Sequence, residues 1–112
     1  MTWDELAAMG LELPATSIGT AYGTPAVLVK GKGFCRVKED GETVVFMTGS
    51  NAEQQLLLEL NPDLCFITDH YRGGQAILAR LANLTPADAR ARLKQGWEHR
   101  APPAVKKAAA RG

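Results

Sequence analysis

The sequence is poor in the residues that hold small proteins together without a large core. It has two cysteines, Cys35 and Cys65, each inside an apolar stretch and neither in a CxxC pair. This spacing argues against a disulfide framework and against a zinc site, so we expect two buried, reduced thiols. The two histidines lie apart from any cluster of carboxylates, and we therefore expect no metal site and no cofactor.

Patterns of catalytic residues are scarce as well. The only serines, Ser17 and Ser50, fall in predicted loop or cap positions. Cys65 lies five residues from His70, but a nucleophilic Cys–His pair needs hydrogen-bond contact and an orienting group, which this spacing does not supply. The segment Gly31-Lys32-Gly33 lacks the longer glycine frame of a phosphate-binding loop. We therefore predict that the protein is not an enzyme.

The sequence also lacks a long hydrophobic run. No apolar stretch approaches the ~18 residues of a membrane span, and the N-terminus lacks the basic and then apolar regions of a signal peptide. We therefore expect a cytoplasmic protein with no membrane partner. Its 112 residues suffice for one domain with an ordinary core, which we place at residues 1–102. The basic, alanine-rich remainder, residues 103–112, is predicted to be disordered.

Charge is unevenly distributed along the chain, although the net charge is only +1. Met1 to Leu64 contains four basic and nine acidic residues, whereas Cys65 to Gly112 contains nine basic and three acidic residues. The basic second half indicates a polyanion or an acidic partner. The near-neutral total favours a small ligand or a protein over DNA, because dedicated DNA-binding domains are usually more basic.

Alternating apolar residues and turn signals predict a three-stranded meander. Its strands are expected at residues 26–29, 34–38 and 43–48. Residues 30–33 form the first turn, and Asp40-Gly41 is expected to form a type I′ turn, which needs positive φ at both central residues.

Three helices and two further strands complete the predicted fold. A capping box at Thr2 and Glu5 opens the first helix, a leucine-rich helix follows Ser50-Asn51, and Thr85 caps the third. The third helix should bury Trp97 and end at Ala101. Strands at residues 64–68 and 76–81 complete a mainly antiparallel sheet of about five to six strands, so we expect an α+β fold.

A basic hairpin is the first candidate binding feature. If the strand after the first turn begins early, period-2 alternation places Lys32, Phe34, Arg36 and Lys38 on one face, with Lys30 at the tip. Such a ribbon could follow a phosphate backbone. In the alternative interpretation, these lysines only keep the hairpin soluble and block strand addition.

The loop between the last two predicted strands is the second candidate. His70, Tyr71 and Arg72 combine an imidazole, a stacking ring and a guanidinium, which suits a phosphate, a carboxylate or an unstacked base. Tyr22 is expected to face the same region. The structural alternative has Asp69 capping a turn, Tyr71 packed on the core and His70 bonded to a neighbouring carbonyl.

The order of these motifs resembles the MmcQ/YjbR-like family of small bacterial proteins. The matching stretches run from about Tyr22 to Pro102 and cover most of the chain. They are Tyr22-Gly23-Thr24-Pro25-Ala26, Gly31-Lys32 with Phe34 and Arg36, Thr68 to Gly73, Leu78 with Arg80-Leu81, and Trp97 with Arg100-Ala101-Pro102.

The resemblance implies an α+β domain similar to the double-wing domain of a phage transcription activator, and with it DNA binding. Our first hypothesis is therefore a small module that binds nucleic acid weakly through its basic side chains, namely Lys30, Lys32, Arg36, Arg72 and Arg80. The alternative is a protein-interaction or small-ligand module in which Tyr22 and the His70-Tyr71-Arg72 loop hold an acidic group.

Overall fold

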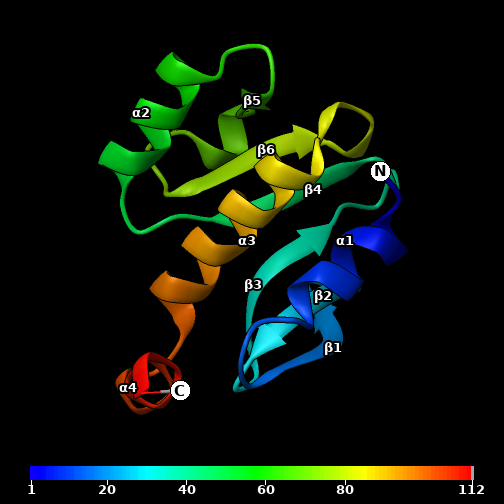
Figure 1. Cartoon of the computed structure of the whole chain (residues 1–112). Coiled ribbons are helices and arrows are strands. Elements are labelled where there is room, and N and C mark those ends of the chain that lie inside the picture. Colours follow the sequence, from blue (N-terminus) through cyan, green and yellow to red (C-terminus); the bar gives the residue numbers. More distant parts are fainter. Residues whose placement is uncertain (112) are drawn as a thin grey trace.

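A computed structural model describes residues 1–111 and has the α+β fold that the sequence predicts. Its centre is one six-stranded antiparallel sheet with the strand order β1-β2-β3-β4-β6-β5 (Figure 1). After β4 the chain passes through a helix to the far edge strand, and then returns to place β6 between β4 and β5. The strands are β1 (Thr16–Ala21), β2 (Thr24–Val29), β3 (Lys32–Val37), β4 (Thr43–Met47), β5 (Cys65–Phe66) and β6 (Ala76–Arg80).

The three predicted helices are all present, and the described residues contain a fourth. Thr2 and Glu5 form the predicted capping box, Ser50 caps α2, and Thr85 caps α3. Two short 3₁₀ turns also occur, one in the loop before β6 and one after β6. The helices and turns are α1 (Trp3–Gly10), α2 (Asn51–Leu60), η1 (Asp69–Tyr71), η2 (Leu81–Asn83), α3 (Pro86–Arg100) and α4 (Pro103–Arg111).

The C-terminal segment differs from the prediction of disorder, because Pro103–Arg111 is helical. Proline at the first helical position is preset for a helix, and the alanines that follow have the highest helix propensity. Val105 also packs against the main core. Gly112, the last residue of the predicted tail, lies outside the described residues. None of the helices in residues 1–111 is long and apolar enough to cross a membrane.

Two tight turns shape the hairpins: one lies within the turn predicted at residues 30–33, but neither is at Asp40-Gly41, where a type I′ turn was expected. The pairs Tyr22-Gly23 and Lys30-Gly31 have positive φ at both residues and join strands across two-residue loops, as type I′ turns do. At Asp40-Gly41 only Gly41 has positive φ, so the type I′ prediction there is wrong. The Asp40 carboxylate instead accepts hydrogen bonds from the backbone of Glu42 and Thr43, which closes a wider loop.

The first two-residue turn follows strand β1, which the sequence analysis did not predict. Its sequence TSIGTA contains Gly19 and no run of large apolar residues, because β1 is an edge strand in which three residues are exposed and three are half-buried. Gly19 leaves room for the Leu28 side chain, since a Cβ there would lie 2.6 Å from Leu28 Cδ1 and displace it.

One face of the sheet carries the main core. Helices α1 and α3 lie across this face (Figure 1), and their buried side chains Leu6, Leu93 and Trp97 join the strand residues in one apolar cluster. Trp97 is buried as predicted, and its indole Nε1 donates to the Pro14 carbonyl at 2.9 Å. Gly96 brings α3 close to the sheet, because a Cβ there would lie 3.0 Å from the Phe34 carbonyl oxygen.

A β-bulge overturns the prediction of a continuous basic ribbon. Val27 pairs with Cys35, but the next residue, Leu28, pairs with Gly33, so Phe34 is the extra residue on β3. Phe34 is fully buried in the main core, while Arg36 points to the opposite face. Alternation therefore breaks at Phe34. Lys32 pairs with the buried Val29 and stays on the face of Phe34, whereas Arg36 lies on the opposite face, so the two cations do not form one ribbon.

Candidate functional site

A pocket opens where β3 separates from β4. These strands pair only from Cys35 to Val37 on the β3 side, so the beginning of β3 diverges from the end of β4. The opening lies next to the loop before β6 and has a volume of about 410 Å³. We call it the β3–β4 pocket. Its walls include apolar residues of the strands (Val45, Met47 and Ala76) and a polar set made of Tyr22, Arg36, His70, Tyr71, Gln75 and Arg100.

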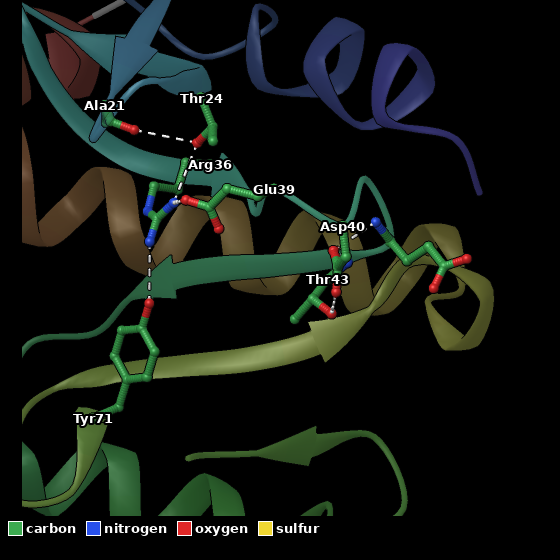
Figure 2. Close-up of polar contacts among 8 residues, drawn as sticks. Ala21, Thr24, Arg36, Glu39, Asp40, Thr43 and Tyr71 are labelled. Atoms are coloured by element: carbon green, nitrogen blue, oxygen red, sulfur yellow. Dashed lines mark hydrogen bonds and ion pairs between the residues drawn. The ribbon is translucent and has the colours of Figure 1, made fainter. Parts of the chain in front are cut away.

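Arg36 forms one wall of the pocket and is held in place from two sides. Its Nη1 donates to Thr24 Oγ1 at 3.2 Å, and its Nη2 donates to the Tyr71 hydroxyl at 3.1 Å (Figure 2). The side chain is 14% exposed, and the nearest carboxylate oxygen, from the exposed Glu39, lies 4.0 Å from Nη1. Because a guanidinium has five N–H donors, Arg36 keeps donors for a ligand after these contacts.

Arg100 brings a second guanidinium to the pocket from the last residue of α3. Its Nε is buried and has no hydrogen-bond partner among residues 1–111. A buried donor without an acceptor costs free energy, and a ligand or an ordered water can supply the acceptor that this Nε needs. The β3–β4 pocket thus receives two cations from elements far apart in the sequence.

The loop before β6 is fastened to α2 by a buried glutamine. Gln54 is 0% exposed, and its Nε2 donates to the Tyr71 carbonyl at 2.9 Å and to the Ala76 carbonyl at 2.7 Å. The β5 strand pairs only with Leu78 and Ala79, so it does not reach Ala76, and the Gln54 amide takes the place of a strand there. Gln54 thereby fixes the segment that carries His70 and Tyr71.

Tyr71 is the centre of this loop. Its ring packs against a second, smaller apolar cluster made of Val45, Ala76 and Leu78. Its hydroxyl accepts a hydrogen bond from Arg36. The His70 ring meets it edge-on with the centroids 4.8 Å apart, and the Lys38 ammonium lies 5.5 Å from the Tyr71 centroid. Tyr71 therefore has the packed, hydrogen-bonded position of the structural interpretation, while His70 and the cations beside it remain available at the surface.

Tyr22 stands at the rim of the pocket, as expected. It is 89% exposed, and its ring lies 5.2 Å from Arg36 Cζ. Its backbone φ is 53°, in the left-handed region that bulky residues rarely adopt.

The lining of the β3–β4 pocket contains no aspartate or glutamate, whereas it contains Arg36, Arg100 and His70. The Cys35 thiol also borders it, but burial raises the pKa of this thiol far above its ordinary value, which disfavours the reactive thiolate. Residues 1–111 contain no group of three His, Cys, Asp or Glu side chains that could hold a metal ion. The chemistry of the pocket therefore suits an anion.

The remaining predicted site residues lie elsewhere. Lys30 and Lys32 flank the β2–β3 turn and do not line the pocket. Arg72 donates to the Asp69 carboxylate at 2.6 Å on the surface. Arg80 donates to Thr43 Oγ1 at 2.8 Å, lies 3.7 Å from Asp40 Oδ2, and covers the Phe66 ring at 5.0 Å.

Sequence reasoning missed two important residues. Arg100 was named only as part of a stretch that carries the family resemblance. Nothing in the local sequence indicates that the last turn of α3 reaches the β3–β4 pocket. Gln54 lies one turn before the leucines of α2 and is buried on the same side of the helix as Leu57. A glutamine on the buried side of a helix was the available signal, since buried amides need partners.

No family model and no curated protein matches this chain.

Proposed function

We propose that this protein is a cytoplasmic binding module, not an enzyme, and that it holds a small acidic ligand in the β3–β4 pocket. The observation that carries the proposal is that Arg36 and Arg100 both line a concave site whose lining has no carboxylate. A volume of about 410 Å³ lies within the range of small-molecule sites, roughly 300–1,000 Å³.

The arrangement suits a phosphate or carboxylate for a specific reason. Guanidinium groups donate in a planar fork that matches both anions, and such charge-assisted bonds are about twice as strong as neutral ones. Arg36 is held by Tyr71 and Thr24, so little side-chain freedom is lost when it binds an anion. The apolar floor of Val45 and Met47 lowers the local dielectric and strengthens the attraction.

Nucleic-acid binding is a second candidate, which a different observation favours. Lys30 and Lys32 are exposed beside a tight turn, and neither has an ion-pair partner within 4.0 Å among residues 1–111. They could contact phosphates as the tip of a wing. Arg72 and Arg80 support this candidate less, because each already has an acidic neighbour.

We further propose that the chain is an MmcQ/YjbR-like protein. The stretches that carry the resemblance are far apart in the sequence, yet Tyr22, Arg36, His70, Tyr71 and Arg100 from these stretches all line one pocket. A shared site gives a physical reason for these residues to occur together.

The proposed function is tested by isothermal titration calorimetry with pyrophosphate and with citrate at low ionic strength. We expect saturable one-site binding, and we expect Arg100→Gln to weaken it about 10-fold to 100-fold, because a charge-assisted hydrogen bond contributes about 1.5–3 kcal/mol. Arg90→Gln is the matched control, since Arg90 is exposed on the same helix and does not line the pocket.

The same series separates the two candidates. Pocket binding predicts that the double variant Lys30→Glu/Lys32→Glu still binds pyrophosphate within about 2-fold of the original protein. The nucleic-acid candidate predicts salt-dependent binding of labelled DNA that this double variant abolishes and Arg100→Gln spares. Absence of pyrophosphate and citrate binding, in protein shown to be folded, would refute the pocket proposal.

A further inference from the structure

Tyr22 is hard to explain as part of the fold. It sits at the first central position of a type I′ turn, where asparagine, aspartate or glycine is usual, and its φ of 53° is strained for a bulky residue. Its ring is 89% exposed, so burial does not compensate for this cost. Strain of this kind tends to gather at binding sites.

The Tyr22 ring is placed where it can contact a ligand in the pocket. The Tyr22 ring stands at the rim of the β3–β4 pocket, with the Arg36 guanidinium 5.2 Å from its centroid. With so much of the ring exposed, aromatic surface remains free for another planar group. The cation beside it orients the ring, and the same cation faces the pocket where an anion is proposed to bind.

We propose that Tyr22 is a stacking platform and that the β3–β4 pocket takes a nucleotide unit. The base stacks on the Tyr22 ring, and the phosphate lies toward Arg36 and Arg100. This inference rests on the proposed function, which requires only an anion; it adds that the anion is joined to a planar ring system.

Two side chains at the pocket can read the rest of such a ligand. His70 and Gln75 also line the pocket, and both carry hydrogen-bonding groups that can meet a base edge or a sugar hydroxyl. Gln75 Nε2 lies 3.0 Å from His99 Nε2, which restrains the Gln75 amide. The pocket lining thus combines an aromatic ring for stacking, guanidinium groups that can bind an anion, and polar side chains that can bond a base or sugar. Sites for unstacked nucleotides use the same combination.

The test compares AMP with ribose 5-phosphate, which keeps the sugar and the phosphate but has no base. Affinities are measured by calorimetry for the original protein, for Tyr22→Asn and for Tyr22→Phe. Asn-Gly is the preferred type I′ pair, so Tyr22→Asn preserves the turn while it removes the ring. Tyr22→Phe keeps the ring and removes only the hydroxyl.

We expect AMP to bind about 5-fold to 150-fold more tightly than ribose 5-phosphate, the range that base–aromatic stacking gives. Tyr22→Asn should remove most of this difference by weakening AMP alone, and Tyr22→Phe should retain it. Equal binding of the two ligands, or an unchanged preference in Tyr22→Asn, would overturn the inference and leave the proposed anion site intact. Failure of AMP and ribose 5-phosphate to bind would also overturn the inference, and the anion site itself would be refuted only if pyrophosphate and citrate failed to bind as well.

A nucleotide unit can be free or part of a strand, and a third titration with a single-stranded oligoadenylate of four nucleotides distinguishes these sources. The oligonucleotide offers four nucleotides, which alone would make its apparent affinity about 4-fold higher than that of AMP. If its affinity exceeds that of AMP by more than this factor, the ligand is a strand. If it binds equally or more weakly, the ligand is a free nucleotide. Both results require Tyr22, so an oligonucleotide that binds Tyr22→Asn with full affinity would count against stacking.

Discussion

Replacing Gln54 with methionine tests how the pocket is held in place. Methionine has nearly the length and volume of glutamine, so Gln54→Met fills the same space and removes only the amide. In the structure this amide donates to the carbonyls of Tyr71 and Ala76. Tyr71 keeps one further donor, since the Gly74 backbone N–H bonds the same oxygen at 3.1 Å.

The magnitude follows from these two donated bonds. The Gln54 Oε1 also accepts from Asn51 Nδ2 at 3.0 Å and from Gln55 Nε2 at 3.1 Å, but both donors are on exposed residues and can bond water instead. The Ala76 carbonyl loses the donor that replaces a strand partner and becomes an unsatisfied buried group, which costs about 1–3 kcal/mol. The Tyr71 carbonyl loses one of two bonds, which costs about 0.5–1.5 kcal/mol. We therefore expect Gln54→Met to lower the free energy of unfolding by about 2–4 kcal/mol, a large share of the roughly 5–15 kcal/mol of a typical domain.

Urea unfolding followed by tryptophan fluorescence and far-UV circular dichroism measures this loss. Gln55→Met is the matched control, because Gln55 is the exposed neighbour on the same helix and its bond to Gln54 Oε1 leaves both groups their other partners or water. It should change stability by less than about 0.5 kcal/mol. A loss below about 1 kcal/mol in Gln54→Met would refute the reasoning, since it would mean that both carbonyls find other donors. A Gln54→Met protein that folds should also bind pyrophosphate more weakly, because the loop with His70 and Tyr71 loosens.

Two further predictions concern α3 and the β3–β4 loop. Gly96→Ala adds a Cβ at 3.0 Å from the Phe34 carbonyl oxygen and 3.1 Å from that of Met47, so overpacking of about 1–3 kcal/mol should outweigh a helix-propensity gain of about 1 kcal/mol. A variant more stable than the original in urea would show that α3 does not approach these strands. Hydrogen bonds from the Glu42 and Thr43 backbone and the Thr43 hydroxyl lower the pKa of Asp40 from 3.8 to about 2. The folded-state pKa lies below the unfolded value, so this stabilisation is complete above about pH 4 and is lost as the pH falls toward 2. Asp40→Asn should therefore reduce stability at pH 7 and flatten the pH dependence between 4 and 2; parallel stability curves for the two proteins would contradict this.

The parts of the fold with strong local signals could be predicted from the sequence. Capping residues such as Thr2 and Thr85 and the apolar periodicity of α3 located the helices and the buried Trp97. Strand β1 could not be predicted, because an edge strand with Gly19 in its middle lacks both apolar alternation and β-branched density. The Asp40-Gly41 pair predicted a type I′ turn that does not form. The Asp40 carboxylate instead accepts hydrogen bonds from backbone N–H groups, and a wider loop results.

The candidate site could be predicted only in part, for a reason of geometry. The local combination of His70 with Tyr71 indicated a binding loop, and the loop lines the pocket with Tyr22 as expected. Arg36, which was assigned to the basic hairpin, lines the same pocket. The bulge at Phe34 could not be read from alternation, and it separates the hairpin-tip lysines from Arg36. Arg100 joins the site only because α3 crosses the sheet to the point where β3 leaves β4, which depends on the tertiary fold.

The central claim is that Arg36 and Arg100 together bind an anion, and NMR of the arginine side-chain Nε–Hε groups tests it most directly. Pyrophosphate is titrated into ¹⁵N-labelled protein, with Arg72 and Arg90 as internal references outside the pocket. We predict that the Arg36 and Arg100 signals shift together along one saturable curve, with Arg100 shifting most because its Nε has no partner before the anion binds. The account would be contradicted if these two signals stayed fixed, or if all the arginine signals shifted alike without saturation.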